Sequence, residues 1–366
     1  MIDTPPNEPR PDAGLAGPVL VVGAGLIGAS VAMALMRAGV QTHLKDVDPT
    51  VAHVASSRGA GSDAPLRTSP EIVVVATPPE HLGAEIAAAL LEFPRSVVTD
   101  VGSIKAKPLA ELVALGISLD RYVGGHPMAG SERSGPLASS ADLFDGRTWA
   151  VVTRDDCEPE AVSVTAALAR TCGANVVRMD TQDHDLAVAR VSHVPHLVAA
   201  LTAAQLASAP LEHLALSGQG VRDVTRIAAG DPVLWQQIVT GNAGAISAIS
   251  SQLRDELDKL VVSLRGEDSG GVRRLLSAGV AGTAVIPGKH GGPSLALEAV
   301  NVAIPDEPGA LARLFADAGE ADVNIEDIRI DHDPGRAFGL VEIDVAADSA
   351  ERLMKALAAR GWSVHR

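Results

Sequence analysis

The chain contains few cysteines, few basic residues relative to acidic ones and no long apolar run, and each shortage excludes a class of protein. Among its 366 residues only Cys157 and Cys172 are cysteines. Two cysteines are too few for a disulfide framework in a chain of this length and cannot form a metal-binding set. We therefore expect two buried, unreactive thiols.

Basic residues are outnumbered, because 30 Lys and Arg stand against 45 Asp and Glu and give a formal net charge of −15. Nucleic acids and anionic membranes both bind basic surfaces, so neither is expected as a partner. An anionic substrate would have to be attracted by local Arg and His side chains against the overall charge.

Long apolar runs are missing too. Hydrophobic residues make up 46% of the chain, but glycine, proline and charged residues interrupt them well before the ~18 apolar residues of a membrane span. Residues 1–17 contain four prolines and no apolar segment, which predicts a disordered leader rather than a signal peptide. We expect a soluble, cytoplasmic protein of two or three domains.

Short apolar strands alternate with helices over residues 18–180. This order is typical of an α/β fold with a doubly wound, Rossmann-type sheet that binds a dinucleotide. The predicted strands are 19–22, 41–46, 71–76, 96–100, 121–125, 148–153 and 175–178, and the predicted helices are 26–37, 81–91, 106–115 and 160–171.

Residues 181–280 predict an all-helical domain. One helix is expected over 183–207 and should be kinked at Pro195, which cannot donate a helix hydrogen bond. Another is expected over 242–264, where an apolar residue recurs every three or four positions. Such a stripe suits helix packing, either within the chain or across a dimer.

Glycine and proline are frequent in residues 281–296, which we interpret as a linker. Residues 297–366 then follow a βαββαβ order, which is typical of a ferredoxin-like domain. Its first helix is expected over 309–318, with Pro308 at the start, where a missing N–H costs nothing. The other helix is predicted over 349–359, and the strands over 297–304, 323–330, 338–345 and 362–365.

The clearest motif is the glycine turn Gly23-Ala-Gly25-Leu-Ile-Gly28 between the first strand and the first helix. Gly23 permits a tight turn, Gly25 allows the backbone to approach a pyrophosphate, and Gly28 permits close packing of the helix. The helix N-terminus favours negative charge. The turn predicts a dinucleotide cofactor, and we expect Leu26, Ile27 and Thr77 to line the same site.

Asp46 follows Gly28 at the end of the second predicted strand. A carboxylate there can accept hydrogen bonds from the adenosine ribose and would repel a 2′-phosphate, which favours NAD over NADP. Two observations leave this open. Asp46 can be no more than a strand-ending turn residue, and the neighbouring Lys45 keeps either cofactor feasible.

His126 follows the strand predicted at 121–125, in a Gly-Gly-His-Pro turn. Ligands of open α/β sheets bind beyond the carboxyl ends of the strands. An imidazole placed there can take the proton of an alcohol while the alcohol carbon loses hydride. The alternative is that His126 is a structural histidine of the turn.

Further along, His193 and His196 share one helix face at a spacing that is also used for metal ligands. No third ligand with a suitable spacing follows, so we expect no metal and infer that they line a cleft. Arg222 and Arg226 suit a clamp for a carboxylate. Alternatively, Arg226 only pairs with Asp223 on the surface.

Five motifs in this order resemble the bacterial prephenate/arogenate dehydrogenases of tyrosine biosynthesis: GAGLIGAS, TDVGSIK, GGHPMAGSE, SHVPH and VRDVTRIAAGDPVLW. The resemblance covers about residues 18–280. The stretches VNVAIPDEPGALARLF and DVNIEDIRI resemble an ACT domain, a module that senses amino acids.

The resemblance implies an NAD-dependent prephenate dehydrogenase, which converts prephenate to 4-hydroxyphenylpyruvate by oxidation and decarboxylation. It implies that His126 accepts the proton of the ring hydroxyl and that Ser103 hydrogen-bonds the same hydroxyl. It further implies that Arg226 binds a substrate carboxylate and that His196 and Trp235 lie near the pyruvyl side chain. His193 has a supporting role.

For the C-terminal domain the resemblance implies a homodimer that is inhibited by tyrosine. ACT domains usually bind amino acids where two of them meet, near the positions that here are Asp306, Gly309, Ala310 and Asn324. The alternative is a domain that only stabilises the dimer.

Three alternative functions stay open on the sequence. Arogenate dehydrogenase performs the same chemistry on a substrate that carries an amino group. Other hydroxyacid dehydrogenases with a helical second domain usually rely on a catalytic lysine. A non-catalytic NAD-binding sensor would use its ACT domain to control a partner.

Overall fold

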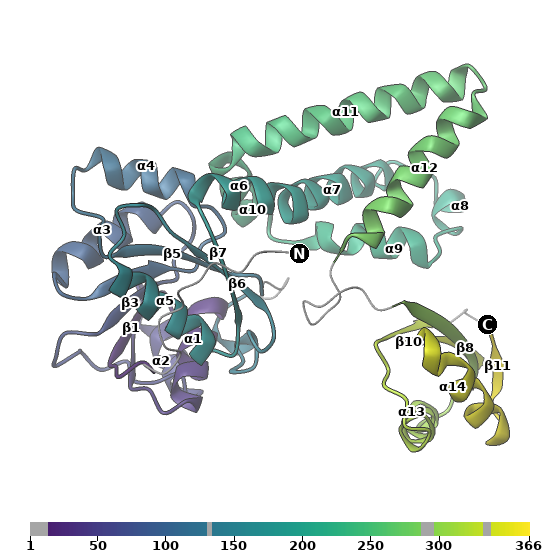
Figure 1. The fold of residues 1–366 in the computed structure, drawn as a ribbon, viewed down its shortest axis with the longest axis horizontal. Coiled ribbons are helices and arrows are strands. Elements are labelled where there is room, and N and C mark those ends of the chain that lie inside the picture. Colours follow the sequence, from purple (N-terminus) through teal and green to yellow (C-terminus); the bar gives the residue numbers. More distant parts are fainter. Residues whose placement is uncertain (1–13, 130–133, 287–295, 332–337) are drawn as a thin grey trace. The chain divides into compact units, whose positions relative to one another are not determined.

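The computed structural model describes residues 14–129, 134–286, 296–331 and 338–366, and it divides into two compact units, residues 1–257 and 258–366 (Figure 1). Most of the predicted leader, part of the GGHPMAGSE motif and most of the predicted linker lie outside the described residues.

The first unit contains a seven-stranded sheet in the order β2-β1-β3-β4-β5-β6-β7. All neighbouring strands are parallel except β5 and β6, which are antiparallel. A single bridge from His43 to Ser62 lies on β2, at the position of a further parallel strand. The Rossmann-type fold is therefore confirmed. Its strands are β1 Val19–Val22, β2 Thr42–Lys45, β3 Ile72–Val75, β4 Val97–Asp100, β5 Tyr122–Pro127, β6 Thr148–Val152 and β7 Asn175–Met179.

Helices cover both faces of this sheet because strand side chains alternate in direction (Figure 1). Val19 and Val21 face the core under α1 Leu26–Arg37, α2 Pro49–Ser57 and α5 Pro159–Thr171. Leu20 and Val22 face the core under α3 Leu82–Glu92 and α4 Ala106–Ala114. Each such buried side chain stabilises the folded state by about 1.5–3 kcal/mol. The two cores therefore hold the strands in place, including the carboxyl ends that carry the site described below.

Two details correct or complete the sequence analysis. Helix α2 is not among the predicted helices, although Asp48 caps it by accepting a hydrogen bond from the N–H of Thr50, and Pro49 occupies its first turn. Cys172 is buried, and burial raises the pKa of its thiol to about 12, whereas Cys157 is only partly buried.

The predicted helix over 183–207 is observed as three segments, α6 Thr181–Val188, the π-helical turn η2 Ala189–His193 and α7 Val194–Leu206. The interruption directly precedes Pro195. By length and composition alone the continuous stretch Thr181–Leu206 could cross a membrane. It nevertheless carries buried, hydrogen-bonded polar side chains, as expected of a core helix: His184, Asp185 and His193.

Five further helices follow in this region: α8 Leu211–Leu214, α9 Gln219–Thr225, the 3-10 turn η3 Arg226–Ala229, α10 Pro232–Gly241 and α11 Ala243–Arg265. Helix α11 carries the predicted apolar stripe. Ile246 is buried, but Leu253, Leu257 and Leu264 are 45%, 56% and 60% exposed. Much of the stripe is therefore available to a further helix.

The second unit contains helix α12 Ser269–Ala284 and a four-stranded antiparallel sheet in the order β11-β8-β10-β9. This is the predicted ferredoxin-like arrangement, with β8 Leu297–Pro305, α13 Ala310–Glu320, β9 Asp327–Asp331, β10 Phe338–Ala346, α14 Ala347–Ala359 and β11 Ser363–His365. Helices α13 and α14 bury Leu side chains against the sheet, among them Leu314, Leu353 and Leu357.

Three predicted boundaries in the second unit were wrong. Helix α12 runs to Ala284, four residues into the predicted linker. Strand β9 begins at Asp327 rather than 323, after a turn in which Asp322 has φ 54°. Gly309 has φ 90° and caps α13 from outside, so Pro308 lies in the preceding turn rather than in the helix.

Candidate active site

The glycine turn joins β1 to α1 at the point where the strand order reverses between β1 and β3. Gly23 has φ 97°, and a Cβ on it would lie 2.5 Å from the carbonyl oxygen of Ala76 after β3. A Cβ on Gly28 would collide with the Gly23 carbonyl. Only glycine fits these positions, and Gly25, the N-cap of α1, leaves the helix N-terminus open to a ligand.

Asp46 lies beside this turn, at the end of β2. Its Oδ2 accepts a hydrogen bond of 2.7 Å from the N–H of Ala24, and its Oδ1 accepts one of 3.0 Å from Asp48. Asp46 therefore has a turn-stabilising role, and this role is compatible with ribose binding because each oxygen has a second lone pair. Lys45, in contrast, is exposed and lies 3.5 Å from Glu92.

Other features at the same edge fit a dinucleotide. Leu26 and Ile27 are partly buried in the first turn of α1. The Oγ1 of Thr77, just after β3, is buried and has no hydrogen-bond partner within the described part of the chain. A side-chain-free turn, a helix N-terminus, a carboxylate and an unpaired hydroxyl are the groups that a dinucleotide requires.

His126 lies within β5 rather than after it. The predicted strand ended at Gly125, but β5 continues to Pro127 because His126 and Pro127 pair with Ala150 and Trp149 of the antiparallel strand β6. The side chain of His126 is buried, with 9% exposed. Pairing with β6 fixes the backbone of His126 more firmly than a turn would.

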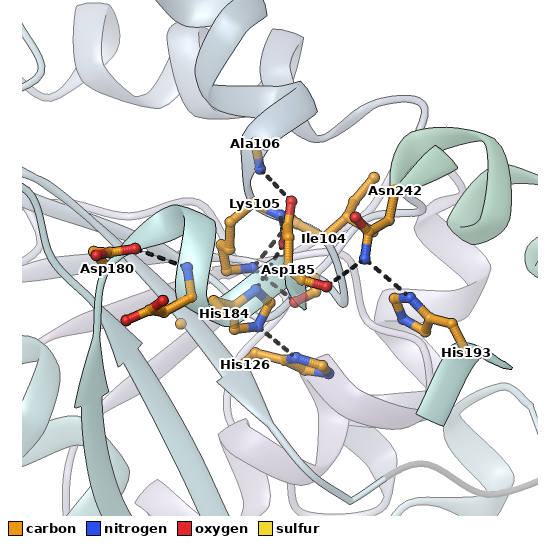
Figure 2. Close-up of polar contacts among 12 residues, drawn as sticks. Ile104, Lys105, Ala106, His126, Asp180, His184, Asp185, His193 and Asn242 are labelled. Atoms are coloured by element: carbon orange, nitrogen blue, oxygen red, sulfur yellow. Dashed lines mark hydrogen bonds and ion pairs between the residues drawn. The ribbon is translucent and has the colours of Figure 1, made fainter. Parts of the chain in front are cut away.

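A chain of hydrogen bonds runs from His126 into helix α6 (Figure 2). Its Nδ1 lies 2.9 Å from Nε2 of His184, and Nδ1 of His184 lies 2.8 Å from Oδ1 of Asp185. The Asp185 carboxylate also accepts the N–H groups of Lys105 and Ala106, each at 2.9 Å. His184 thus bridges His126 to a carboxylate held at the start of α4.

The charge states of this chain follow from burial. Burial lowers the pKa of His126 well below its usual value, and the positive charge of Lys105 lowers it further. Burial also lowers the pKa of His184, although Asp185 opposes the effect. The pKa of Asp185 is lowered, because hydrogen bonds from His184 and two backbone N–H groups outweigh the opposite effect of burial. At neutral pH the two imidazoles are neutral and Asp185 is ionised.

The loop after β4 is held by a buried ion pair. The Nζ of Lys105 lies 2.7 Å from Oδ2 of Asp100 and 2.7 Å from the carbonyl oxygen of Gly102. The hydroxyl of Tyr122 donates to Oδ1 of Asp100 at 2.9 Å. Ser103 lies on this loop, partly exposed. The loop of Ser103 follows β4, and His126 lies on the neighbouring parallel strand β5, although no hydrogen bond joins their side chains among the described residues.

His193, His196 and Trp235 lie together. The rings of His196 and Trp235 stack with centroids 3.5 Å apart, and His193 meets Trp235 edge-on at 6.2 Å. Burial lowers the pKa of His193 to about 4, and its Nδ1 lies 3.2 Å from Nδ2 of Asn242. The described residues contain no cluster of three metal ligands. The two histidines therefore form an aromatic wall, with Trp235 as its third member.

Arg226 is exposed and begins η3, which packs against α7, the helix of His196. Across the residues that the structure describes, no ion pair joins Arg226 to Asp223, and the Asp223 carboxylate accepts a hydrogen bond of 2.9 Å from Gln219. Among the described residues Arg226 has no ion-pair partner. Its guanidinium is therefore available to a ligand.

Four residues of this network were not predicted from the sequence: Asp100, His184, Asp185 and Asn242. Asp100 lies within the TDVGSIK motif, so the motif contained a signal for it. His184 and Asp185 follow the helix-capping residue Asp180, but no local pattern indicates that their side chains meet His126.

In the second unit, the four residues predicted to bind a regulatory ligand lie near the start of α13 and before β9. Asp306, Gly309 and Asn324 are exposed, and Ala310 is partly buried. The Nδ2 of Asn324 donates a hydrogen bond of 2.7 Å to Glu326.

The strand order, the glycine turn and a buried histidine at the same sheet edge define a dinucleotide-dependent dehydrogenase with a helical second region. Residues 31–178 match the family model of the prephenate dehydrogenase nucleotide-binding domain, and residues 180–278 match that of the prephenate dehydrogenase dimerization domain. The chain belongs to the prephenate dehydrogenase family. The family, the fold class and the enzyme class predicted from the sequence are thereby confirmed.

Individual relatives agree with this assignment. The chain is 34% identical to the probable prephenate dehydrogenase NovF of Streptomyces niveus, over 94% of this chain and 98% of the relative. The structure resembles prephenate dehydrogenase of Aquifex aeolicus in complex with hydroxyphenyl propionate and NAD+, at 28% identity and a TM-score of 0.64, covering 73% and 98% of the two chains. It also resembles Synechocystis arogenate dehydrogenase, at 26% identity and a TM-score of 0.63, covering 72% and 98%.

Proposed function

We propose that this protein catalyses the NAD-dependent oxidation and decarboxylation of prephenate to 4-hydroxyphenylpyruvate in tyrosine biosynthesis. The observation that carries the proposal is the buried, neutral His126 on β5, a strand that ends at the same edge of the sheet as β1 with its glycine turn. A neutral imidazole beside a dinucleotide site is the base that oxidation of an alcohol requires.

The reaction begins when Nε2 of His126 accepts the proton of the ring hydroxyl, to which Ser103 also hydrogen-bonds. NAD, when bound, supplies the acceptor for the hydride of the same ring carbon. The resulting dienone loses its ring carboxylate as carbon dioxide, and the electrons of the broken bond enter the ring. His126 then returns its proton to the phenolate oxygen. Formation of the aromatic ring makes the sequence effectively irreversible.

Substrate binding falls to the helical region. Arg226 presents a planar guanidinium that matches two carboxylate oxygens. The stacked pair His196 and Trp235, with His193 behind it, lies beside the pyruvyl side chain. The protein must bind the substrate without stabilising the ring carboxylate that leaves as carbon dioxide. We therefore assign Arg226 to the pyruvyl carboxylate, which stays on the product.

For the cofactor we propose NAD rather than NADP. The carboxylate of Asp46 lies at the end of β2, where it would accept hydrogen bonds from the adenosine ribose of a bound dinucleotide. Lys45, the residue that kept NADP feasible, lies near Glu92 instead. The A. aeolicus relative, which was crystallised with NAD+, supports this choice.

Arogenate is the alternative substrate, and the similarity to Synechocystis arogenate dehydrogenase supports it. Initial rates measured with prephenate and arogenate, each with NAD and NADP, test the proposal. We expect the highest kcat/KM with prephenate and NAD. A higher kcat/KM with arogenate would reassign the substrate, and no turnover in any combination would overturn the proposed function.

For the whole chain we propose a cytoplasmic homodimer with domains at residues 18–180, 181–284 and 297–366, after a leader 1–17. The linker between the last two domains follows helix α12, which ends at Ala284. The exposed apolar stripe of α11 and the match to a dimerization domain support the dimer. The C-terminal ferredoxin-like domain acts as an ACT domain that binds the inhibitor tyrosine, with Asp306 receiving its ammonium, the backbone at Gly309 and Ala310 its carboxylate, and Asn324 close by.

A further inference from the structure

We propose that His184 and Asp185 are positioning residues for the reaction: together they hold His126 in the one tautomer that leaves its Nε2 free to accept the substrate proton. The inference rests on the proposed role of His126 as the base. It concerns two residues that lie outside the five motifs of the sequence and that join the base to another part of the fold.

The tautomer follows from the order of donors and acceptors. An ionised carboxylate only accepts hydrogen bonds, so Asp185 requires a proton on Nδ1 of His184, 2.8 Å away. Neutral His184 then has a bare Nε2, which accepts a hydrogen bond from Nδ1 of His126 over 2.9 Å. With its only proton on Nδ1, neutral His126 has a lone pair on Nε2.

The hydrogen-bond chain from His126 to Asp185 is anchored at Asp185, which prevents its donors and acceptors from exchanging roles. Both oxygens of Asp185 accept backbone N–H groups at the start of α4, and its own carbonyl oxygen accepts a hydrogen bond of 2.7 Å from Asn242 (Figure 2). His184 is fully buried and Asp185 is 5% exposed. Rotation of either side chain would leave buried polar groups without hydrogen-bond partners, which is unfavourable.

The same chain supports the protonated base. Burial is the largest cause of the low pKa of His126. Three neighbouring groups lower this pKa further when they are charged: Lys105 at the start of α4, His184 on α6 and His193 on η2. Asp185 supplies the compensating negative charge through neutral His184. When Nε2 of His126 takes the substrate proton, its Nδ1 proton strengthens the hydrogen bond to His184 and the positive charge is shared toward Asp185.

Two variants of His184 separate this role from simple packing. In His184→Gln the amide oxygen still accepts the Nδ1 proton of His126, whereas in His184→Leu a side chain of similar size accepts nothing. The matched control is His43→Gln, another buried histidine with hydrogen bonds to Gln41 and the Ala64 carbonyl but remote from the catalytic network. We would measure kcat, KM for NAD, the pH profile of kcat/KM and the melting temperature.

We expect His184→Leu to lose about 10²-fold or more in kcat, as expected when a base is held in the wrong tautomer. His184→Gln should stay within about 10-fold of the wild type, since it preserves one hydrogen bond. In His184→Leu the acidic limb of kcat/KM should also move to lower pH, because protonated His126 has lost its support. His43→Gln should change neither the limb nor KM for NAD.

Equal losses of kcat in the Leu and Gln variants, with an unmoved acidic limb, would show that His184 only fills space and would overturn the inference. Unchanged kcat in both variants would overturn it as well. Either result is separate from a failure of the proposed function, which wild-type turnover of prephenate and its loss in His126→Asn test without any change at His184.

Discussion

The Nδ1 atom of His126 on strand β5 lies 2.9 Å from the Nε2 atom of His184 on helix α6, although the two residues are 58 positions apart in the chain. This contact joins β5, a parallel strand of the Rossmann-type sheet, to α6, the first helix of the helical region. The proposed base is therefore oriented by a helix that also leads, through η2 and α7, to the wall of His193, His196 and Trp235.

Asp46→Ser should lower kcat/KM with NAD and raise the relative use of NADP, because the charge that repels a 2′-phosphate is removed; Asp46→Arg should shift the preference further. Steady-state kinetics with both cofactors provide the test. The control is Asp48→Asn, two residues on, which removes a nearby charge but keeps an acceptor for the α2 cap. An unchanged ratio of kcat/KM values in both Asp46 variants would limit Asp46 to its hydrogen bonds with the turn.

Arg226→Lys should raise KM for prephenate about 10-fold or more, because an ammonium keeps the charge but loses the second, parallel hydrogen bond of the guanidinium. The melting temperature should not change, since Arg226 is exposed and has no ion-pair partner among the described residues. Arg178→Lys, an exposed arginine on β7, serves as the control. A wild-type KM together with a lower melting temperature would assign Arg226 a structural role.

Lys105→Met should lower the free energy of unfolding by about 3–5 kcal/mol, because it leaves the buried carboxylate of Asp100 without its cation. The two side chains are 2% and 0% exposed. Lys45→Met, which breaks the exposed pair with Glu92, should cost only about 0–1 kcal/mol. Urea denaturation measures both. Similar costs for the two variants would mean that the ion pair does not hold the Ser103 loop.

Tyrosine should inhibit the full chain but not a chain that ends at Pro293, which should remain active. In the full chain, Asp306→Asn should weaken inhibition, because the amide cannot pair with the tyrosine ammonium. Inhibition constants for the three proteins test the regulatory proposal. Equal inhibition of the shortened chain would mean that tyrosine competes at the active site and that the C-terminal domain only stabilises the dimer.

Local sterics made part of the fold predictable from the sequence. The glycine turn was identifiable because Gly23 and Gly28 lie where any Cβ would collide with backbone, and the βαββαβ order of the second unit followed from alternating apolar patterns. The direction of β6 was not identifiable, since no local pattern tells whether a strand runs parallel to its neighbour. The end of β5 was therefore placed before His126 instead of after Pro127.

The candidate site divides in the same way. His126, Ser103 and Arg226 lie in recognisable motifs, so their positions could be proposed from the sequence. His184 and Asp185 could not, because their meaning depends on a tertiary contact between α6 and β5. Lys105 was visible within its motif, but only its burial against Asp100 shows that it holds the loop after β4.

The most direct test of the account is the rate of NADH formation from prephenate by His126→Asn at saturating NAD. An asparagine keeps a hydrogen-bonding side chain on β5 but cannot accept a proton at neutral pH. We expect kcat to fall about 10²- to 10⁴-fold, with the dissociation constant for NAD unchanged because the glycine turn is untouched. A variant that binds NAD and keeps the wild-type kcat at neutral pH would contradict the account, since His126 would then be a structural residue.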